Sequence, residues 1–513
     1  MAQYGVGQPL PLLKVRRPAL GSFSTHWRPL QRTLQHGTHM LVVGGMEKSM
    51  DPKNNQKNPL AWPQSHPQSH LSPDIAYLDR WLYLPTDGLY MKQSIRDSLT
   101  IRSPKAWDES GVKEFRAYED LEFHLAVPRA FLTPVQVESM GYPVRDLRPH
   151  KLGTPWKHTI TPRTESQADA MRALDRLVET GESGILEMGC GKGKTVMSLY
   201  FAAQRGLSTL IIVNSTSLLN QWRDEVATHL GKPCGLIRGD KMECLPVSIA
   251  TIQTLASREI PEDVLNMYGT IIFDECHHLS APTFNSVCPM FAGVRLGLTA
   301  TRQREDGLEG LYLHHIGPVI YRDLTTELQP NVIFLRTGIT MTSEERESIE
   351  VNEMVNISKL RGWLANQDLR NGLILNEILS ARQEGRASLV LGHNIEHLTY
   401  LHSQIPDAGL YIGKMSLSKR DVVLKTQDVI FATTKLAAEG LDEPRLDTLF
   451  IITPFKSTNL LQQAMGRVLR IFEGKQDPLV VVFEDPIVSC INLTTALKNW
   501  LKQKGIRFKV ESL

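Results

Sequence analysis

The chain has 513 residues, which at about 150 residues per domain predicts roughly three domains, each able to bury its own core. Hydrophobic residues make up 42% and charged residues 22%, so a disordered or fibrous protein is excluded. Lys and Arg number 57 against 55 Asp and Glu, a formal charge of +2, which excludes a globally basic packaging protein. Any nucleic-acid surface must come from local clustering of charge.

Six cysteines show no Cys-x-x-Cys pair and no spacing typical of a zinc site or a disulfide framework. We therefore expect reduced thiols in a reducing compartment: the cytoplasm, the nucleus or a viral replication site. No run approaches 18 apolar residues, so we expect a soluble chain without a transmembrane helix.

The first 74 residues read as a flexible leader. Residues 1–46 contain no Asp or Glu but carry five Lys and Arg, and residues 51–74 are rich in Pro, Asn, Gln, Ser and His. An acid-free, Arg-containing start is also typical of an organellar transit peptide. Prolines at positions 9, 11, 18 and 29 would break its amphipathic helix, so organellar targeting is disfavoured.

Residues 75–155 predict a small accessory domain of short strands and turns. Apolar runs at 81–84 and 121–127 are separated by Pro, Gly and Asp. By analogy alone this domain is a candidate for engaging DNA.

From residue 156 onward, short apolar runs alternate with helical stretches, which predicts parallel sheets in an α/β fold. One unit covers 156–342. A second covers 343–485 and starts with a charged, helix-like stretch, and 486–513 add a C-terminal helix and strand. The five strands expected in each unit are 184–188, 209–213, 247–251, 270–274 and 294–299, then 387–392, 409–413, 428–432, 448–453 and 479–484. The duplication implies a cleft between the two units.

The first of these strands leads into a Gly-rich turn and then a helix, an arrangement that cradles phosphates. Gly189, Gly191 and Gly193 let backbone N–H groups close around a β-phosphate. Lys194 would reach the β- and γ-oxygens and Thr195 would ligate Mg²⁺. A glycine-rich surface turn is the alternative, but the order of strand, turn, Gly-Lys-Thr and helix favours the cradle.

Two carboxylates, Asp274 and Glu275, stand at the C-terminal end of the strand expected at 270–274, at the edge where open α/β sheets present ligands. Asp274 would hold Mg²⁺ through water, and Glu275 would polarise the attacking water. Such an acidic pair can also merely brace a loop.

Asp-Glu-Cys-His at 274–277 resembles the DExH box of superfamily 2 helicases, and the other motifs of that superfamily follow in order. Residues 298–301 resemble motif III, Thr434 with Gly440-Leu441-Asp442 resembles motif V, and residues 463–470 resemble motif VI. The likeness covers about 156–485. It implies two tandem RecA-like parallel-sheet domains preceded by the accessory domain, with ATP and Mg²⁺ as cofactors.

The run Leu-Gly-Leu-Thr-Ala-Thr at 296–301, followed by Arg304-Glu305-Asp306, resembles the XPB group, and the phage UvsW type and poxvirus type are similar in layout. Arg302 stands where many relatives have Pro, and the charged triplet could also be a solvated surface. The resemblance implies that duplex or junction DNA is bound, with Arg304 among its contacts, and that the polarity is 3′ to 5′.

Other motif positions are carried over from the same resemblance. Gln167 would bond adenine, although the aromatic that usually precedes it is Ser166 here. The stretches 214–218 and 251–255 resemble motifs Ia and Ib, whose hydroxyls and amides grip backbone phosphates. The candidate nucleic-acid contacts are Thr216, Gln253, Thr254, Arg304 and Thr434. Trp222 is more typical of a core residue than of a base platform.

The second unit would contribute to the nucleotide site from across the cleft. Gly440 and Asp442 are candidate nucleotide contacts, and Gln463, Arg467 and Arg470 are candidate catalytic groups. We expect the two arginines to begin a helix and to share one face of it.

Lys192 adds positive charge on the first unit. We expect His277 to couple the nucleotide site to motifs III and VI by hydrogen bonds. Zinc is disfavoured because His277 and His278 have no further ligand at suitable spacing.

The resulting hypothesis is an ATP-dependent DNA helicase or translocase. An RNA helicase or transcript-release factor is the nearest alternative, because grips on phosphate look alike for either nucleic acid. A non-catalytic nucleic-acid-binding scaffold is the alternative from another class, but it would have no use for the full set of catalytic residues. DNA is the expected partner, RNA is a second possibility, and no membrane association is expected.

Overall fold

The computed structural model describes residues 71–512 with short gaps. The gaps are residues 90, 109–110, 150–151, 190, 279–280, 301–308, 326–328, 352–353, 435, 437–440, 442, 454 and 471. The expected leader lies outside the described residues up to position 70. In the part described, no helix combines the length and the apolar character that a membrane span requires.

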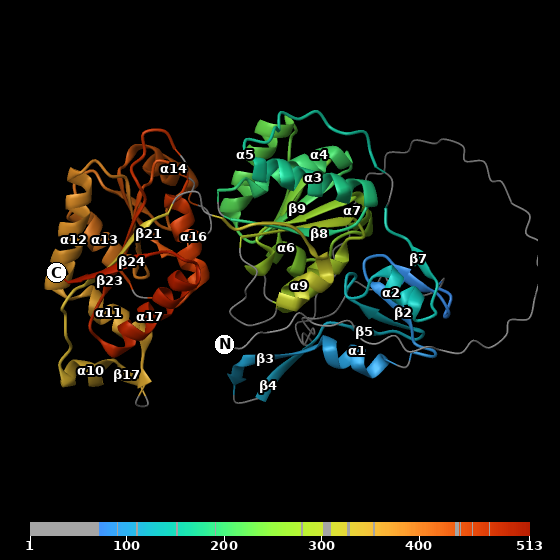
Figure 1. Cartoon of the computed structure of the whole chain (residues 1–513), viewed down its shortest axis with the longest axis horizontal. Coiled ribbons are helices and arrows are strands. Elements are labelled where there is room, and N and C mark those ends of the chain that lie inside the picture. Colours follow the sequence, from blue (N-terminus) through green and yellow to red (C-terminus); the bar gives the residue numbers. More distant parts are fainter. Residues whose placement is uncertain are drawn as a thin grey trace, which may run out of the picture. The chain divides into compact units, whose positions relative to one another are not determined.

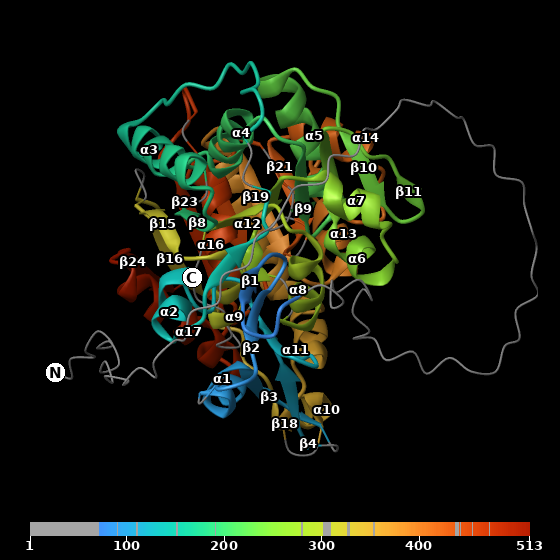
Figure 2. The same ribbon diagram turned by 90° about the vertical axis from the view of Figure 1, so that its right-hand side faces the viewer.

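The accessory domain is a five-stranded, mostly antiparallel sheet with two helices and a separate hairpin. Its sheet order is β5 (Glu119–Asp120), β6 (His124–Val127), β2 (Leu82–Pro85), β1 (Ala76–Leu78) and β7 (Val144–Asp146). The helices are α1 (Lys92–Leu99) and α2 (Pro134–Ser139). The hairpin of β3 (Thr100–Asp108) and β4 (Gly111–Arg116) extends away from the sheet (Figures 1 and 2).

The first RecA-like domain is an eight-stranded sheet that is parallel except for one edge hairpin. Its order is β11 (Lys241–Met242), β10 (Gly235–Arg238), β12 (Val247–Thr251), β9 (Thr209–Val213), β13 (Thr270–Phe273), β14 (Val294–Thr299), β8 (Gly184–Met188) and β15 (Val319–Asp323). The inner strands are buried along their whole length, as expected of a parallel sheet covered on both faces.

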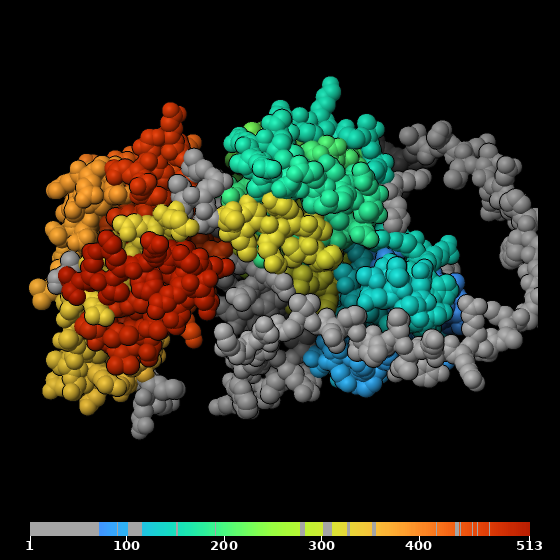
Figure 3. Space-filling model, in the orientation of Figure 1, coloured from blue at the N-terminus to red at the C-terminus, as the bar shows by residue number. Residues whose placement is uncertain are grey.

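Helices cover both faces of this sheet (Figure 1). One face packs against α3 (Glu165–Thr180), α4 (Lys194–Arg205) and α5 (Thr216–Leu230). The other packs against α6 (Ile252–Ser257), α7 (Glu262–Met267), α8 (Ala281–Val287) and α9 (Glu309–Ile316). Leu311 of α9 also belongs to the core of the accessory domain. The space-filling view shows the blue and cyan accessory residues directly against the green and yellow surface of this domain (Figure 3).

The second RecA-like domain is a seven-stranded, all-parallel sheet. Its order is β20 (Gly409–Tyr411), β21 (Val429–Thr433), β19 (Ser388–Gly392), β22 (Thr448–Ile451), β23 (Leu479–Glu484), β16 (Asn331–Arg336) and β24 (Phe508–Ser512). One core contains residues of α14 (Leu417–Thr426), α16 (Thr458–Val468) and α17 (Val488–Gln503), and the other those of α12 (Asp368–Gln383) and α13 (Ile395–Ser403).

The predicted fold class is confirmed, and the strand at 479–484 and four of the five strands predicted in the first unit have the expected bounds. The two sheets divide at a different place from the expected boundary at 342, because β16 pairs with β23 and β24 of the second sheet. The stretch 343–384 is broken into α10 (Ser343–Ile349), the small hairpin of β17 (Glu350–Val351) and β18 (Met354–Val355), α11 (Ile357–Ala365) and α12. The C-terminal strand β24 is an edge strand of the second sheet.

Candidate functional site

The turn after β8 adopts a backbone that only glycine accommodates easily. Gly191 and Gly193 have φ of +78° and +87°, in the left-handed region. A Cβ on Gly193 would also lie 2.8 Å from Nε2 of Gln167. The sequence therefore folds here into a tight loop that ends directly at the N-terminus of α4.

Lys194 and Thr195 are the first two residues of α4. Nζ of Lys194 lies over the loop and donates to the carbonyl oxygens of Met188, at 2.9 Å, and Gly189, at 3.4 Å. The free N–H groups of the helix start and this ammonium group form a site that attracts anions. The structure thus brings together the residues predicted to cradle a phosphate.

An unpredicted carboxylate, Asp323 at the end of β15, borders the same loop. Its Oδ2 lies 3.4 Å from Nζ of Lys192 and accepts from the Ser166 hydroxyl, while its backbone oxygen accepts from Gly189 at 2.8 Å. Burial favours the neutral acid, but hydrogen bonds from Ser166 and Thr325 and the charge of Lys192 hold the pKa of Asp323 below its usual value. Lys192 is therefore engaged by a carboxylate and not simply a free charge facing the cleft.

Gln167 lies against the loop, as the resemblance implied. Its Nε2 donates to the backbone oxygen of Lys192 at 3.2 Å, and its Oε1 accepts from the backbone N–H of Arg163 at 2.9 Å. Tyr321 of β15 donates through its hydroxyl to Ser166 at 3.1 Å. A tyrosine hydroxyl thus contacts Ser166, the residue that stands in the usual aromatic position.

Asp274 and Glu275 follow β13, and Asp274 is almost completely buried. Burial, together with the neighbouring charge of Glu275, raises the pKa of Asp274 to about 6, while Trp222 and Lys194 act in the opposite sense. Nε1 of Trp222 donates to Oδ2 of Asp274 at 2.8 Å. Trp222 is a core residue, as predicted, but it also orients the carboxylate, a role that its sequence position did not reveal.

A buried histidine links this acidic pair to the end of β14. Nδ1 of His277 lies 2.8 Å from the hydroxyl of Thr299 and 3.4 Å from Oε2 of Glu275. The expected link between His277 and motif III is therefore present. Burial next to both acids raises the pKa of the Cys276 thiol well above its usual value, so this cysteine is an inert core residue.

The candidate nucleic-acid contacts divide into exposed and buried ones. Gln253, the second residue of α6, is exposed, and its Nε2 donates to the backbone oxygen of Asn214 at 2.9 Å, which joins the start of α6 to the short connection between β9 and Thr216. Thr254 is buried and bonds to Thr251 at 2.8 Å. Thr434 is also buried and donates to the Gly392 oxygen at 3.0 Å. Of these four, only Thr216 and Gln253 are accessible to a ligand.

The motif VI arginines lie at the end of a helix, so the expectation of a helix start is wrong. Arg467 is in the last turn of α16, which ends at Val468, and Arg470 lies beyond it. Their spacing therefore does not place them on one helical face. The Cγ of Arg470 lies 3.7 Å from the position of a Cβ on Gly191. Gln463 is buried, while its neighbour Gln462 donates to the backbone oxygen of Ala300 at 3.1 Å.

Three predicted site residues, Arg304, Gly440 and Asp442, lie outside the described residues.

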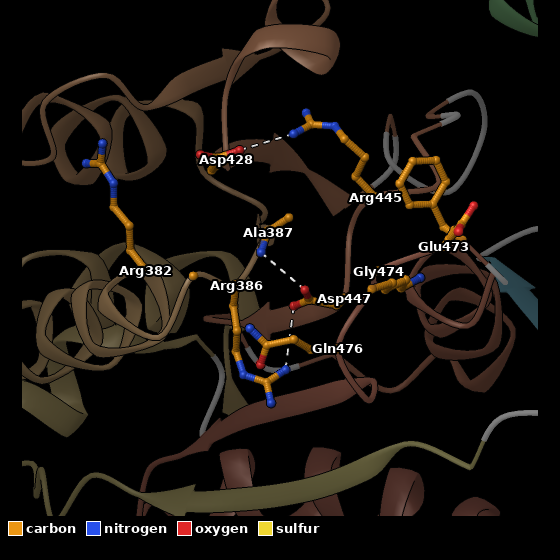
Figure 4. A pocket seen from close by; sticks show the side chains of 12 residues that line it. Arg382, Arg386, Ala387, Asp428, Arg445, Asp447, Glu473, Gly474 and Gln476 are labelled. Carbon is orange, nitrogen blue, oxygen red and sulfur yellow. Dashed lines mark hydrogen bonds and ion pairs between the residues drawn. The ribbon is translucent and has the colours of Figure 1, made fainter.

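A pocket of about 270 Å³ opens at the amino ends of strands in the second domain, away from the phosphate loop (Figure 4). Its charged walls pair with each other: Arg445 bonds to Asp428 at 3.1 Å, and Arg386 lies 3.6 Å from Asp447. Lys475, also in the wall, donates to the backbone oxygen of Arg470 at 2.8 Å. Lys475 thus connects the wall of this pocket to the backbone of Arg470.

Comparison with known proteins agrees with this geometry. Residues 160–304 match the family described as "Type III restriction enzyme, res subunit", and residues 371–472 match the "Helicase conserved C-terminal domain" family. The chain thus carries the two domains that superfamily 2 helicases share. The first matched region contains the phosphate loop and the acidic pair, and the second contains the motif VI helix.

Relatives of the helicase include cellular and viral proteins. It is 29% identical over 309 residues to the DNA 3′-5′ helicase XPB of Kineococcus radiotolerans, which covers 56% of this chain and 54% of that protein. It is 26% identical over 366 residues to a mimivirus protein named as a candidate ATP-dependent RNA helicase, covering 68% and 67%. It is 26% identical over 317 residues to a candidate helicase, D10, of Escherichia phage T5, covering 59% and 68%. The chain spans about half the length of the XPB relative.

The contact between Trp222 and Asp274 leads to a prediction for the helicase. A Trp222→Phe variant keeps an aromatic ring but loses the donor to Oδ2, so a buried acceptor is left without it. We expect the free energy of unfolding to fall by about 1–3 kcal/mol and half-maximal ATP hydrolysis to require more Mg²⁺. Denaturant unfolding and a Mg²⁺ titration of hydrolysis measure the two effects. An unchanged Mg²⁺ requirement would contradict the orienting role of Trp222.

Proposed function

We propose that this chain couples ATP hydrolysis to movement along DNA or to its unwinding. The observation that carries the proposal is the continuous arrangement of Lys194, the buried Asp274 and Glu275, with His277 connecting the acids to Thr299. This arrangement gives phosphate binding, water activation and a link from hydrolysis to the neighbouring strand. It is the set of groups that a scaffold without catalysis would not need.

The residues at the loop fit a magnesium ion. Thr195 offers a hydroxyl oxygen and Asp274 a carboxylate oxygen, both hard donors of the kind Mg²⁺ binds. A cation there would also offset the cost of burying Asp274 beside Glu275, which otherwise raises the pKa of Asp274. Bound Mg²⁺ would neutralise charge on the phosphates, while Lys194 binds the same oxygens and Glu275 accepts a proton from water.

The accessible polar groups just after β9 and β12 support nucleic acid as the second ligand. Thr216 begins α5 and is half-buried, Gln253 is exposed in the first turn of α6, and the hydrogen bond from Gln253 to Asn214 holds these two helix starts together. Hydroxyl and amide groups bind phosphate oxygens without reading the sequence of bases. DNA is favoured because the XPB relative is named as a DNA helicase. RNA is the second candidate, because the mimivirus relative is named for RNA.

The test is ATP hydrolysis measured with single-stranded DNA, duplex DNA and RNA side by side. We expect stimulation by DNA over the rate without nucleic acid, and weaker stimulation by RNA. Stimulation by RNA alone would replace DNA with RNA as the substrate. Hydrolysis that responds to neither nucleic acid would contradict the proposal.

The division of roles between the two acids gives a further prediction. A Glu275→Gln variant loses the group that activates water, so turnover should fall by about 10²-fold or more. Nucleotide affinity should stay close to that of the wild type, because Lys194 and Asp274 are intact. Binding of a fluorescent ATP analogue, measured beside hydrolysis, separates the two effects. A loss of affinity as large as the loss of turnover would show that Glu275 also binds the nucleotide.

A further inference from the structure

Two buried arginines join the accessory domain to the first RecA-like domain. Arg129, just after β6 of the accessory domain, donates to the backbone oxygens of Ala292 at 2.9 Å and Gly293 at 3.1 Å, and to the Ser183 hydroxyl at 2.9 Å. All three acceptors belong to the RecA-like domain. Only 4% of the surface of Arg129 is exposed.

The second arginine points the other way. Arg295, the second residue of β14, is fully buried and donates to the backbone oxygen of Arg80 in the accessory domain at 2.7 Å. It also donates to the backbone oxygens of His315, at 2.8 Å, and Phe291, at 3.0 Å, within its own domain. Ser183, which accepts from Arg129, also accepts from the backbone N–H of Arg295 at 2.9 Å. The two side chains are therefore parts of one network.

Such a network fixes the docked position of the accessory domain closely. Moving a charged group out of water is costly unless oriented acceptors replace its hydration. Here carbonyl and hydroxyl oxygens replace it, and several of them come from the opposite domain. Separating the two domains would leave Arg295 without the Arg80 oxygen, one of its acceptors. Because this bond must be kept, a shift of the accessory domain should shift Arg295 and β14 with it.

The accessory domain also contacts α9, which follows residue 308 in the sequence. The backbone N–H of Ala130 donates to the His314 oxygen at 2.7 Å, the ring of Phe131 packs edge-on against His314, and Leu311 lies in the accessory core. The accessory domain therefore holds the chain both before and after residues 296–310. That segment includes Thr299, whose hydroxyl bonds to His277 next to Glu275.

We propose that Arg129 and Arg295 are positioning residues through which the docked accessory domain sets the place of Thr299, and so the response of ATP hydrolysis to nucleic acid. β14 is the physical connection, since Arg295 lies near its accessory end and Thr299 at its catalytic end. The inference rests on the proposed function. It gives the accessory domain a part in coupling nucleic-acid binding to hydrolysis, beyond contacting nucleic acid itself.

The test compares two variants at the same interface in the full chain. Arg129→Ala removes the bonds that Arg129 makes across the interface, whereas Glu262→Ala removes the exposed contact of Arg80 with Glu262, 2.6 Å, on α7. The measurement is the ratio of the hydrolysis rate at saturating DNA to the rate without DNA. For Arg129→Ala we expect this ratio to fall about fivefold or more, with the basal rate and the KM for ATP little changed. Glu262→Ala should keep the wild-type ratio.

A merely structural role predicts a different result. Fewer folded molecules would lower the basal and stimulated rates together, so an unchanged ratio in Arg129→Ala would overturn the inference. If Arg129→Ala does not fold, Arg129→Lys keeps the charge but loses the planar fork. It should show a reduced ratio, and a wild-type ratio in Arg129→Lys would overturn the inference. A wild-type chain that no nucleic acid stimulates would instead contradict the proposed function itself.

Discussion

A Lys194→Ala variant should lose ATP hydrolysis almost completely. Nζ of Lys194 lies over the Met188 and Gly189 oxygens, at the mouth of the loop that we expect to bind a phosphate. Removing this ammonium group would take away the charge proposed to stabilise the β- and γ-phosphates, and loss of one such donor typically costs about 10²–10³ in rate. We expect a loss of at least that size in the rate of phosphate release.

The fold should tolerate the change, because Lys194 is only partly buried and its two hydrogen bonds are to a loop. Thermal unfolding should therefore remain cooperative and near the wild-type midpoint. A matched control is Lys232→Ala, which removes a lysine that stacks on Trp156, 4.5 Å from the ring centre, in the same domain. Hydrolysis at the wild-type rate by Lys194→Ala would contradict the phosphate-loop assignment.

The second large effect is expected from Arg470→Ala. Arg470 lies beyond α16, its backbone oxygen is held by Lys475, and its side chain approaches Gly191 of the phosphate loop. An arginine that reaches the γ-phosphate stabilises charge in the transition state, and an arginine finger can supply about 10³–10⁵ in rate. We expect Arg467, the other motif VI arginine, to share this role, so Arg470→Ala should lower DNA-stimulated hydrolysis by about tenfold or more.

Unwinding should be lost in the same variant, while affinity for ATP falls only modestly, since the phosphate loop is intact. Rates of hydrolysis and of strand separation, measured together, check this. The competing account is that both arginines are surface ion-pair partners, worth about 0–1 kcal/mol. Normal unwinding by the double variant Arg467→Ala/Arg470→Ala would favour that account.

Local sequence pattern was enough to predict the parallel strands of the first RecA-like domain and the residues that lie at their ends. Buried parallel strands are apolar along their length, so β8, β9, β12 and β14 could be delimited to the residue. The positions of the glycines before Lys194 and of the acids after β13 could also be predicted, because strand, turn and helix follow one another directly in the sequence.

The predictions that were wrong concern features that depend on contacts between distant parts of the chain. β16 reads as a strand of either unit, and only its pairing with β23 and β24 assigns it to the second sheet. The local pattern also predicted a helix that begins at the two arginines, whereas α16 begins at Thr458, includes Gly466 and Arg467, and ends before Arg470.

The sequence pattern was sufficient to predict Asp323 as a site residue, but not to predict the network of Arg129 and Arg295. The run Val-Ile-Tyr-Arg-Asp at 319–323 ends in an acid at the carboxyl end of a strand, which is the rule that identified Asp274. Arg129 and Arg295 look like ordinary surface arginines in sequence. Their acceptors are backbone oxygens of another domain, which no residue pattern encodes.

The most direct test of ATP-driven movement on DNA is displacement of streptavidin from biotinylated single-stranded DNA, with the biotin at either the 3′ or the 5′ end. We expect ATP-dependent displacement from one end, none with a non-hydrolysable analogue, and none with Glu275→Gln. DNA-stimulated hydrolysis without displacement from either end, and without separation of a duplex, would contradict the coupling of hydrolysis to movement.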